Sequence, residues 1–193
     1  MANQKLFDAS SIRSYLEKYR NEIEHALTCL EEAPFSVLVS LLRDSFLKKG
    51  RIFVAGNGGS ASIAEHLSCD FSKGTAKLNV ISLTSNTALT TALANDEGYE
   101  HIFERQLKMQ NLTKKDTVIL ISSSGNSPNI VNAASYASGK CPVIGFSGFD
   151  GGRLKELADV KFHIPIHNYG LVEDCHQIIM HIITQWIMTQ EWI

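Results

Sequence analysis

A serine-rich turn is the first feature of this sequence that could carry chemistry. It reads SSSGNSP over residues 122–128 and begins where the apolar run TVILIS ends. Serine is favoured just before a helix and proline at its first position, so Ser127 and Pro128 predict a helix start. Hydroxyls in front of free helical N–H groups can bind phosphate without a lysine. We therefore predict a phosphate site at Ser122, Ser123, Ser124 and Ser127; the alternative is a loop that only caps a helix.

A glycine-rich turn, GNGGSA at residues 56–61, forms a second site of the same kind. It formally matches the G-x-G-x-x-A pattern of dinucleotide sites. Such a site needs an acidic residue at the end of the next strand, and the segment LNVISLTSNT (78–87) offers only hydroxyls and amides. The sequence also lacks the G-x-x-x-x-G-K-[ST] pattern that a nucleoside triphosphate requires. A single small phosphate monoester fits both turns better than a nucleotide does.

Five short apolar runs must position these turns. They are RIFVAG (51–56), LNVISL (78–83), TVILIS (117–122), PVIGFS (142–147) and VKFHIPI (160–166). Strands that are apolar along their whole length, with helical segments between them, are typical of a parallel sheet covered on both faces. We predict a doubly wound, five-stranded parallel α/β sheet of the flavodoxin type. Its ligands should lie at the carboxyl ends of the strands, where both turns fall.

Apolar stripes with helical spacing flank the predicted sheet. One runs from residue 10 to 32, a second helix is expected between Pro34 and Gly50, and a long helix begins near Val172. Either these helices cover one face of the sheet, or they form a bundle with other subunits. We divide the chain into a helical extension (1–49) and an α/β core (50–193) of one domain spanning 1–193.

Composition excludes several classes of protein. The 193 residues are 44% hydrophobic and 20% charged, with a formal net charge of −2. No polybasic run suggests nucleic acid, and no apolar run is long enough to span a bilayer. The start of the chain lacks the pattern of a secretory signal, so we expect a cytoplasmic protein. Four cysteines without C-x-x-C spacing indicate buried apolar residues rather than a disulfide framework.

The two turns together resemble the sugar isomerase (SIS) domain, a doubly wound fold that binds phosphosugars. The segments ANDEGYEHIFERQ (94–106) and GFDGGRLKELADVKFHIPI (148–166) are similar to those of bacterial phosphoheptose isomerases. The resemblance implies isomerisation of sedoheptulose 7-phosphate to a heptose 7-phosphate for surface polysaccharide. It also implies a homotetramer with one zinc ion per subunit. The family's sugar and phosphate contacts fall here on Asn57, Gly58, Gly59, Ser60 and Asp96, besides the four serines above.

The resemblance assigns the metal to His66, Asp70, Glu173 and His181, with Asp70 and His181 also acting as acid and base. Spacing agrees with this, because the first two lie four residues apart on one helical face. Glu173 and His181 lie eight apart, on nearly one face of the last helix. Two histidines and two carboxylates form a mixed set suitable for zinc. Alternatively, the first pair is a surface pair and His181 is a core histidine.

Two departures from the family pattern leave the substrate open. Similar isomerases have Glu at the position of Asp70, and D-R-I-Q-x-x-H where this chain reads GLVEDCH at 170–176. The changes could preserve a metal site or mark another sugar phosphate, such as an arabinose or hexulose phosphate. A third hypothesis is a SIS-domain protein without catalysis that binds a replication initiator or another partner. The GNGGS and SSSGNS turns favour the enzymes.

Overall fold

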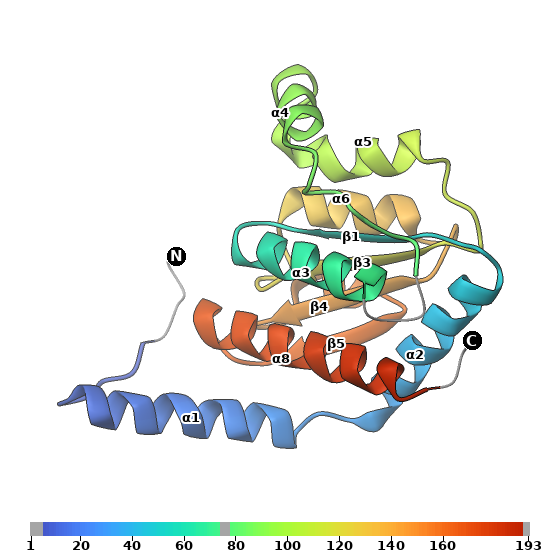
Figure 1. The fold of residues 1–193 in the computed structure, drawn as a ribbon. Helices are drawn as coiled ribbons and strands as arrows, with labels where there is room; N and C mark the ends of the chain where they lie inside the picture. Colours follow the sequence, from blue (N-terminus) through green and yellow to red (C-terminus); the bar gives the residue numbers. More distant parts are fainter. Residues whose placement is uncertain (1–5, 74–77, 191–193) are drawn as a thin grey trace.

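A parallel sheet lies at the centre of the computed structural model, which describes residues 6–73 and 78–190 (Figure 1). The described residues form five strands in the order β2-β1-β3-β4-β5, all parallel. The predicted doubly wound architecture is confirmed. The strands are β1 (Ile52–Gly56), β2 (Val80–Ser82), β3 (Thr117–Ser122), β4 (Val143–Gly148) and β5 (Val160–Ile164).

Both faces of the sheet are buried along its central strands, which explains why β1, β3 and β4 are largely apolar; at the edge, β5 alternates and exposes Lys161. Along β1, Ile52 and Val54 pack into one core, whereas Phe53 and Ala55 pack into the other. Because successive side chains of a strand point to opposite faces, every position of β1 is enclosed. The first core lies under α2 (Glu32–Leu47), α3 (Gly59–Lys73) and α8 (Tyr169–Met188). The second lies under α4 (Thr87–Asp96), α5 (Ile102–Met109), α6 (Pro128–Ala137) and α7 (Gly152–Leu157).

The terminal helices form as predicted, with shifted ends. Helix α1 (Ile12–Thr28) packs on α8 and starts after Ser11, whose side chain caps the Ser14 N–H (Figure 1). Helix α2 begins two residues before Pro34 rather than after it. Proline is tolerated there because the first four N–H groups of a helix have no partner within it. Helix α8 begins at Tyr169, three residues earlier than expected, because the Asn168 side chain caps the Leu171 N–H.

The apolar stripe of α1 is only partly buried against the core. Ala26 of α1 is buried in the first core, but Ile12 and Leu16 are 75% and 62% exposed. Two of the four cysteines, Cys29 and Cys69, are also exposed, which corrects the expectation that all are buried.

Among the described helices, none alone is long and apolar enough to cross a membrane; only α1 and α2 together, bent by 69°, pass that test.

A buried ion pair fixes the register between β1 and β3 where both strands begin. The carboxylate of Asp116 accepts hydrogen bonds from the backbone N–H, Nε and Nη2 of Arg51 at 2.9, 3.0 and 2.8 Å. It also accepts bonds from the backbone N–H and hydroxyl of Thr113. Burial alone would raise the pKa of Asp116, but these donors outweigh it and hold the pKa at about 2. The ionised carboxylate is therefore part of the folded state.

We expect Asp116→Ala to lower the free energy of unfolding by about 3 kcal/mol, since it removes the carboxylate partner of a partly buried guanidinium. The loss should be present above pH 3.8, the ordinary pKa, and should shrink as the pH falls toward 2, because wild-type Asp116 then takes up a proton. Urea denaturation at several pH values measures it. Asp44→Ala, which breaks an exposed pair with Lys48, should cost less than about 0.5 kcal/mol. Equal losses in both variants would contradict the structural role.

Candidate active site

A cleft of about 130 Å³ lies at the carboxyl ends of β1 and β3. These neighbouring strands mark the point where the strand order reverses, which is where ligands bind in doubly wound sheets. Both turns singled out in the sequence contribute to it. Its lining residues are Asn57, Ser60, Ile121, Ser122, Ser123, Ser124, Ser127, Tyr169 and Glu173. Within the described part of the chain, they include hydroxyls, an amide and one carboxylate, but no lysine or arginine.

The hydroxyls of the serine turn at residues 122–127 do not cap helix α6. Ser127 is the N-cap of α6 and Pro128 its first residue, as predicted, yet the Ser127 side chain makes no capping hydrogen bond. Its hydroxyl instead lies 3.1 Å from that of Ser122. The Ser123 hydroxyl is buried and has no hydrogen-bond partner among the described residues. Gly125 has a φ of 67°, and a Cβ there would lie 1.9 Å from the Gly151 carbonyl oxygen, so the turn requires glycine.

An amide pair joins the glycine turn to the serine turn. The side chains of Asn57 and Asn129 exchange two hydrogen bonds of 2.9 Å, and Tyr99 donates a further bond to Asn57. The amide of Asn57 is thus largely occupied, and its predicted contact with sugar requires rearrangement. Asn129 is buried at the start of α6, and no motif in the sequence points to it. Asp96, also predicted to contact sugar, is exposed at the end of α4 and does not line the cleft.

The carboxylate of Glu173 reaches the N-terminus of α3. A Cβ on Gly59, the first residue of that helix, would lie 2.3 Å from Oε2 of Glu173, so only glycine permits this approach. Gly58, at φ 55°, shapes the turn just before it. Burial, and to a smaller extent the charge of Asp174, raise the pKa of Glu173. The cleft therefore contains a carboxylate that favours its protonated form more than an exposed glutamate does.

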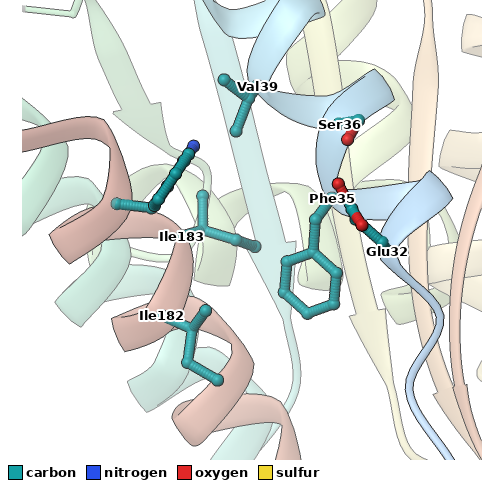
Figure 2. Close-up of a pocket in the computed structure, with 7 residues that line it drawn as sticks. Glu32, Phe35, Ser36, Val39, Ile182 and Ile183 are labelled. Atoms are coloured by element: carbon teal, nitrogen blue, oxygen red, sulfur yellow. The ribbon is translucent and has the colours of Figure 1, made fainter. Parts of the chain in front are cut away.

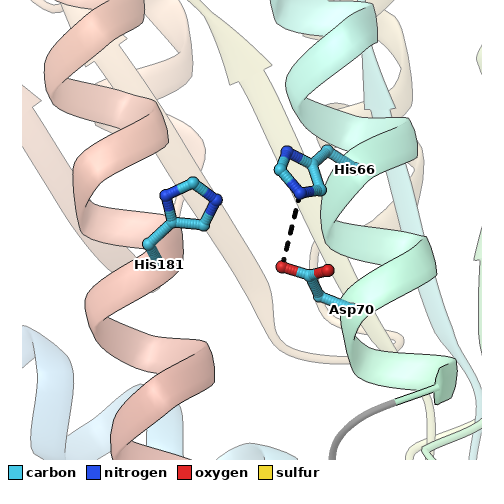
Figure 3. A group of neighbouring side chains, drawn as sticks. All are labelled: His66, Asp70 and His181. Carbon is cyan, nitrogen blue, oxygen red and sulfur yellow. Dashed lines mark ion pairs between the residues drawn. The ribbon is translucent and has the colours of Figure 1, made fainter.

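A separate group of possible metal ligands lies between α3 and α8. His66 and Asp70 project from α3 toward His181 on α8 (Figure 3). Each residue offers one ligand atom, and these atoms lie within 4.8 Å of one another. His66 Nε2 lies 3.6 Å from Asp70 Oδ2, and the two histidine rings are 5.0 Å apart between centroids. The structure thus brings together three of the four predicted metal residues; Glu173 is not in this group.

Gln177 occupies the space between the two histidines. Its Nε2 lies 3.2 Å from Nδ1 of His66 and 3.0 Å from Nε2 of His181. Its residue type does not single it out in the sequence, since a glutamine on an amphipathic helix is ordinary. His176, one residue earlier, points the other way: it is fully buried, contacts the Ser147 carbonyl oxygen, and its pKa is lowered to about 4 by burial. His176 is therefore neutral and structural.

Helices α3 and α8 run side by side and connect the cleft with the group of possible metal ligands (Figure 1). Along α3, Ser60 at the cleft precedes His66 by six residues, or about 9 Å at the helical rise. Along α8, Glu173 at the cleft precedes Gln177 by four residues, or about 6 Å. A small chain molecule with a phosphate in the cleft could therefore extend toward the histidines. The arrangement suits binding at one end of a ligand and proton transfer at the other.

The fold and this two-part site define a doubly wound α/β protein with a polar cleft at the carboxyl edge of its sheet, where such folds bind their ligands. Residues 14–148 match the family model described as the SIS domain. A phosphoheptose isomerase of Helicobacter pylori (strain ATCC 700392 / 26695) is 34% identical over 177 residues, which are 88% of this chain and 90% of that protein. The chain therefore belongs to the SIS domain family and, within it, to the phosphoheptose isomerases.

Solved structures agree with this assignment. The phosphoheptose isomerase GmhA of Neisseria gonorrhoeae superposes with a TM-score of 0.84 at 27% identity, covering 91% of this chain and 96% of that one. A phosphoheptose isomerase from Francisella tularensis gives 0.85 at 26% identity, covering 93% and 97%. The likeness includes nearly the whole length of both chains. The resemblance noted in the sequence is confirmed.

Proposed function

We propose that this protein is a phosphoheptose isomerase that interconverts sedoheptulose 7-phosphate and D-glycero-D-manno-heptose 7-phosphate. The similarity over almost the full length of proteins of that name carries the proposal. The site supports it, because a cleft suited to one phosphate lies a short distance from a group suited to acid-base chemistry. The product would supply heptose for lipopolysaccharide or capsule, in the cytoplasm.

Phosphate binding in this proposal uses hydroxyls and helix ends instead of cations. Ser60 and Ser127 stand at the N-termini of α3 and α6, where the helix dipoles favour an anion. Ser122, Ser123 and Ser124 complete the cleft. The phosphate is remote from the reacting carbons, so its binding energy can orient the open-chain sugar.

The reaction requires two proton transfers on neighbouring carbons. A base removes a proton from C1 of the ketose, an enediol forms, and a proton is returned to C2, while a second group serves the oxygens. We assign the carbon protons to Asp70 and the oxygen protons to His181. Both side chains are partly exposed and face each other across α3 and α8. A substrate can therefore reach them.

The residues between α3 and α8 also fit a zinc ion, one per subunit. Two imidazoles and a carboxylate with ligand atoms within 4.8 Å form a donor set that zinc accepts, with room for a fourth ligand. When bound, zinc would polarise a carbonyl oxygen and make the neighbouring C–H more acidic. His66, Asp70 and His181 would hold it. The fourth position belongs to Glu173 in the family pattern.

The decisive experiment is conversion of sedoheptulose 7-phosphate by the purified protein, followed by NMR of the products. The proposal expects turnover with added zinc and loss of turnover after exhaustive chelation, with recovery when zinc is restored. No turnover by folded, zinc-loaded protein would exclude the heptose reaction. Arabinose 5-phosphate and hexulose 6-phosphates would then be tested, and a binding assay with a replication initiator would examine the role without catalysis.

An apolar groove between α2 and α8 supports the proposed homotetramer (Figure 2). It has a volume of about 480 Å³ and is lined by Glu32, Phe35, Ser36, Val39, Ile182, Ile183 and Trp186. Ile182 and Trp186 are 44% and 57% exposed. Large exposed apolar side chains that are clustered in a groove mark interaction surfaces. Association of copies through this face would bury them.

We expect Trp186→Asp to raise the dissociation constant of the assembly at least about thirtyfold, since a tryptophan at an interface commonly contributes about 2 kcal/mol or more to binding. Sedimentation velocity over a range of protein concentrations measures the shift to smaller species. Met109→Asp is the matched control, because Met109 is similarly exposed at 52% but lies on α5, across the sheet. Unchanged assembly of Trp186→Asp, or equal weakening by both changes, would place the contact elsewhere.

A further inference from the structure

The side chain of Asn57 lines the cleft, and its amide has two unlike ends. The oxygen Oδ1 only accepts hydrogen bonds, whereas the nitrogen Nδ2 only donates them, through two N–H groups. A phosphate offers oxygens that accept, and the cleft as the described residues form it has no lysine or arginine to donate to them. The direction in which the Asn57 amide is held therefore affects what the cleft can bind.

The first turn of α6 sets the direction of a neighbouring amide, that of Asn129. The backbone N–H of Ile130 is shared between Oδ1 of Asn129, at 2.9 Å, and the carbonyl oxygen of Ser127, at 3.0 Å. An N–H can donate to the amide oxygen but not to the amide nitrogen, so Oδ1 of Asn129 must lie on this side. Asn129 is 1% exposed, which leaves little room for water to replace these contacts. Both ends of the Asn129 amide thus have fixed places.

Asn129 and Tyr99 impose a direction on the Asn57 amide. Nδ2 of Asn129 donates to Oδ1 of Asn57, and Nδ2 of Asn57 donates back to Oδ1 of Asn129, both at 2.9 Å. The hydroxyl of Tyr99 donates to the same Asn57 oxygen, also at 2.9 Å. An Asn57 amide turned end for end would set nitrogen against nitrogen and oxygen against oxygen, which leaves polar groups unpaired. The Asn57 oxygen is therefore fully used.

One N–H of Asn57 remains for a ligand. Of the two on Nδ2, one is donated to Asn129, and the other has no acceptor among the residues that the structure describes. Use of this N–H leaves the hydrogen bonds of Asn57 to Asn129 and Tyr99 in place, whereas a sugar contact through Oδ1 would break at least one of them. The amide is thus held with a donor free, which suits the oxygens of a phosphate.

We infer that Asn129 and Tyr99 are positioning residues of the phosphate site: they hold the amide of Asn57 so that its free N–H is donated to a phosphate oxygen in the cleft. Neither residue lines the cleft, so both act through Asn57. The inference rests on the phosphate site of the proposed function and adds these two residues to it. It does not depend on which sugar carries the phosphate.

The affinity for inorganic phosphate tests the inference without turnover. A titration of the full chain followed by ³¹P NMR gives the dissociation constant of each variant. Tyr99→Phe keeps the ring but removes one donor, and should raise the constant by about threefold to tenfold. Asn129→Leu is neutral and similar in shape, and should raise it at least about tenfold, since a hydrogen bond to a charged group is lost. Tyr136→Phe is the matched control: it removes a hydroxyl from α6 that does not line the cleft, and should stay within about twofold of wild type.

A double-mutant cycle separates positioning from a direct effect on phosphate. Asn57→Ala removes the contact itself, so adding Tyr99→Phe or Asn129→Leu to it should raise the dissociation constant by less than about twofold more. Losses that persist at full size in the Asn57→Ala background would show that the two residues act without Asn57, and would overturn the inference. Unchanged phosphate affinity in either single variant, Tyr99→Phe or Asn129→Leu, would overturn it as well.

The proposed reaction and the inference can fail separately. Wild-type protein that binds no phosphate would overturn the phosphate site and the inference together. The expected pattern of phosphate affinities in a protein that does not convert sedoheptulose 7-phosphate would exclude the heptose reaction and support the inference. Circular dichroism and thermal unfolding confirm that each variant is folded. Tyr99→Phe keeps the test decisive if Asn129→Leu does not fold, because Tyr99 is 56% exposed and lies outside the core.

Discussion

Asp70→Asn is expected to lower the turnover of sedoheptulose 7-phosphate by about 10³-fold, within the range attributed to a positioned acid or base. The amide keeps the shape of the side chain but cannot accept the C1 proton. Since Asp70 is also a proposed zinc ligand, the assay is run at saturating zinc, and the zinc content of the variant is measured alongside. Activity that stays low in fully loaded protein assigns the loss to proton transfer.

Isotope exchange gives a second measurement of the same change. In D₂O, wild-type protein should incorporate deuterium into the sugar at the carbons that exchange protons, whereas Asp70→Asn should not. Asp70→Glu is the conservative control, because similar isomerases carry glutamate there, and it should retain at least about a tenth of the activity. Rapid exchange by zinc-loaded Asp70→Asn would show that another group, with Glu173 the first to examine, removes the proton.

The fold was predictable because each strand carries its own signal. Runs such as TVILIS are apolar on four consecutive residues, as a strand buried on both faces requires, and β3 is formed by these same residues. The ends of helices were less predictable. Tyr169 and Glu32 lie inside helices that apolar spacing placed later, because the cap at Asn168 and the tolerance of a first turn for proline are local effects.

The site was predictable where function depends on local sequence. The helix start at Ser127 and Pro128 and the pairing of His66 with Asp70 follow from spacing along one element. Contacts between elements were not predictable in this way. Asn129 meets Asn57, and Gln177 meets His66, across distances of 72 and 111 residues in the chain. Only the packing of α3, α6 and α8 around the sheet brings such residues together.

Glu173 shows that unpredicted contacts between elements also affect a residue role carried over from a family pattern. Its position on α8 matches the family's metal residue, yet its carboxylate lies at the first residue of α3. The absence of a side chain on Gly59 makes that contact possible. A residue of different charge at a matched position can thus take a neighbour that the family pattern does not indicate.

The double change Ser122→Ala/Ser127→Ala is expected to lower kcat/KM for the sugar phosphate by about 10³-fold. Each hydroxyl that binds a charged group contributes roughly 1.5–3 kcal/mol, and two are removed from one cleft. Little stability should be lost, because the Ser127 side chain makes no capping hydrogen bond that α6 would miss. Steady-state kinetics and thermal unfolding measure the two effects separately.

Phosphate dependence distinguishes binding from a general disturbance of the site. Inorganic phosphate should inhibit the wild-type protein more strongly than it inhibits the double variant. The wild-type protein and the double variant should convert sedoheptulose at equal rates, because sedoheptulose has no phosphate for the serines to bind. Ser135→Ala, an exposed serine on the same helix, should behave as wild type. If inhibition by phosphate is unchanged in the double variant, the serine turn only shapes the start of α6, and the anion must bind through Ser60 and the N-terminus of α3.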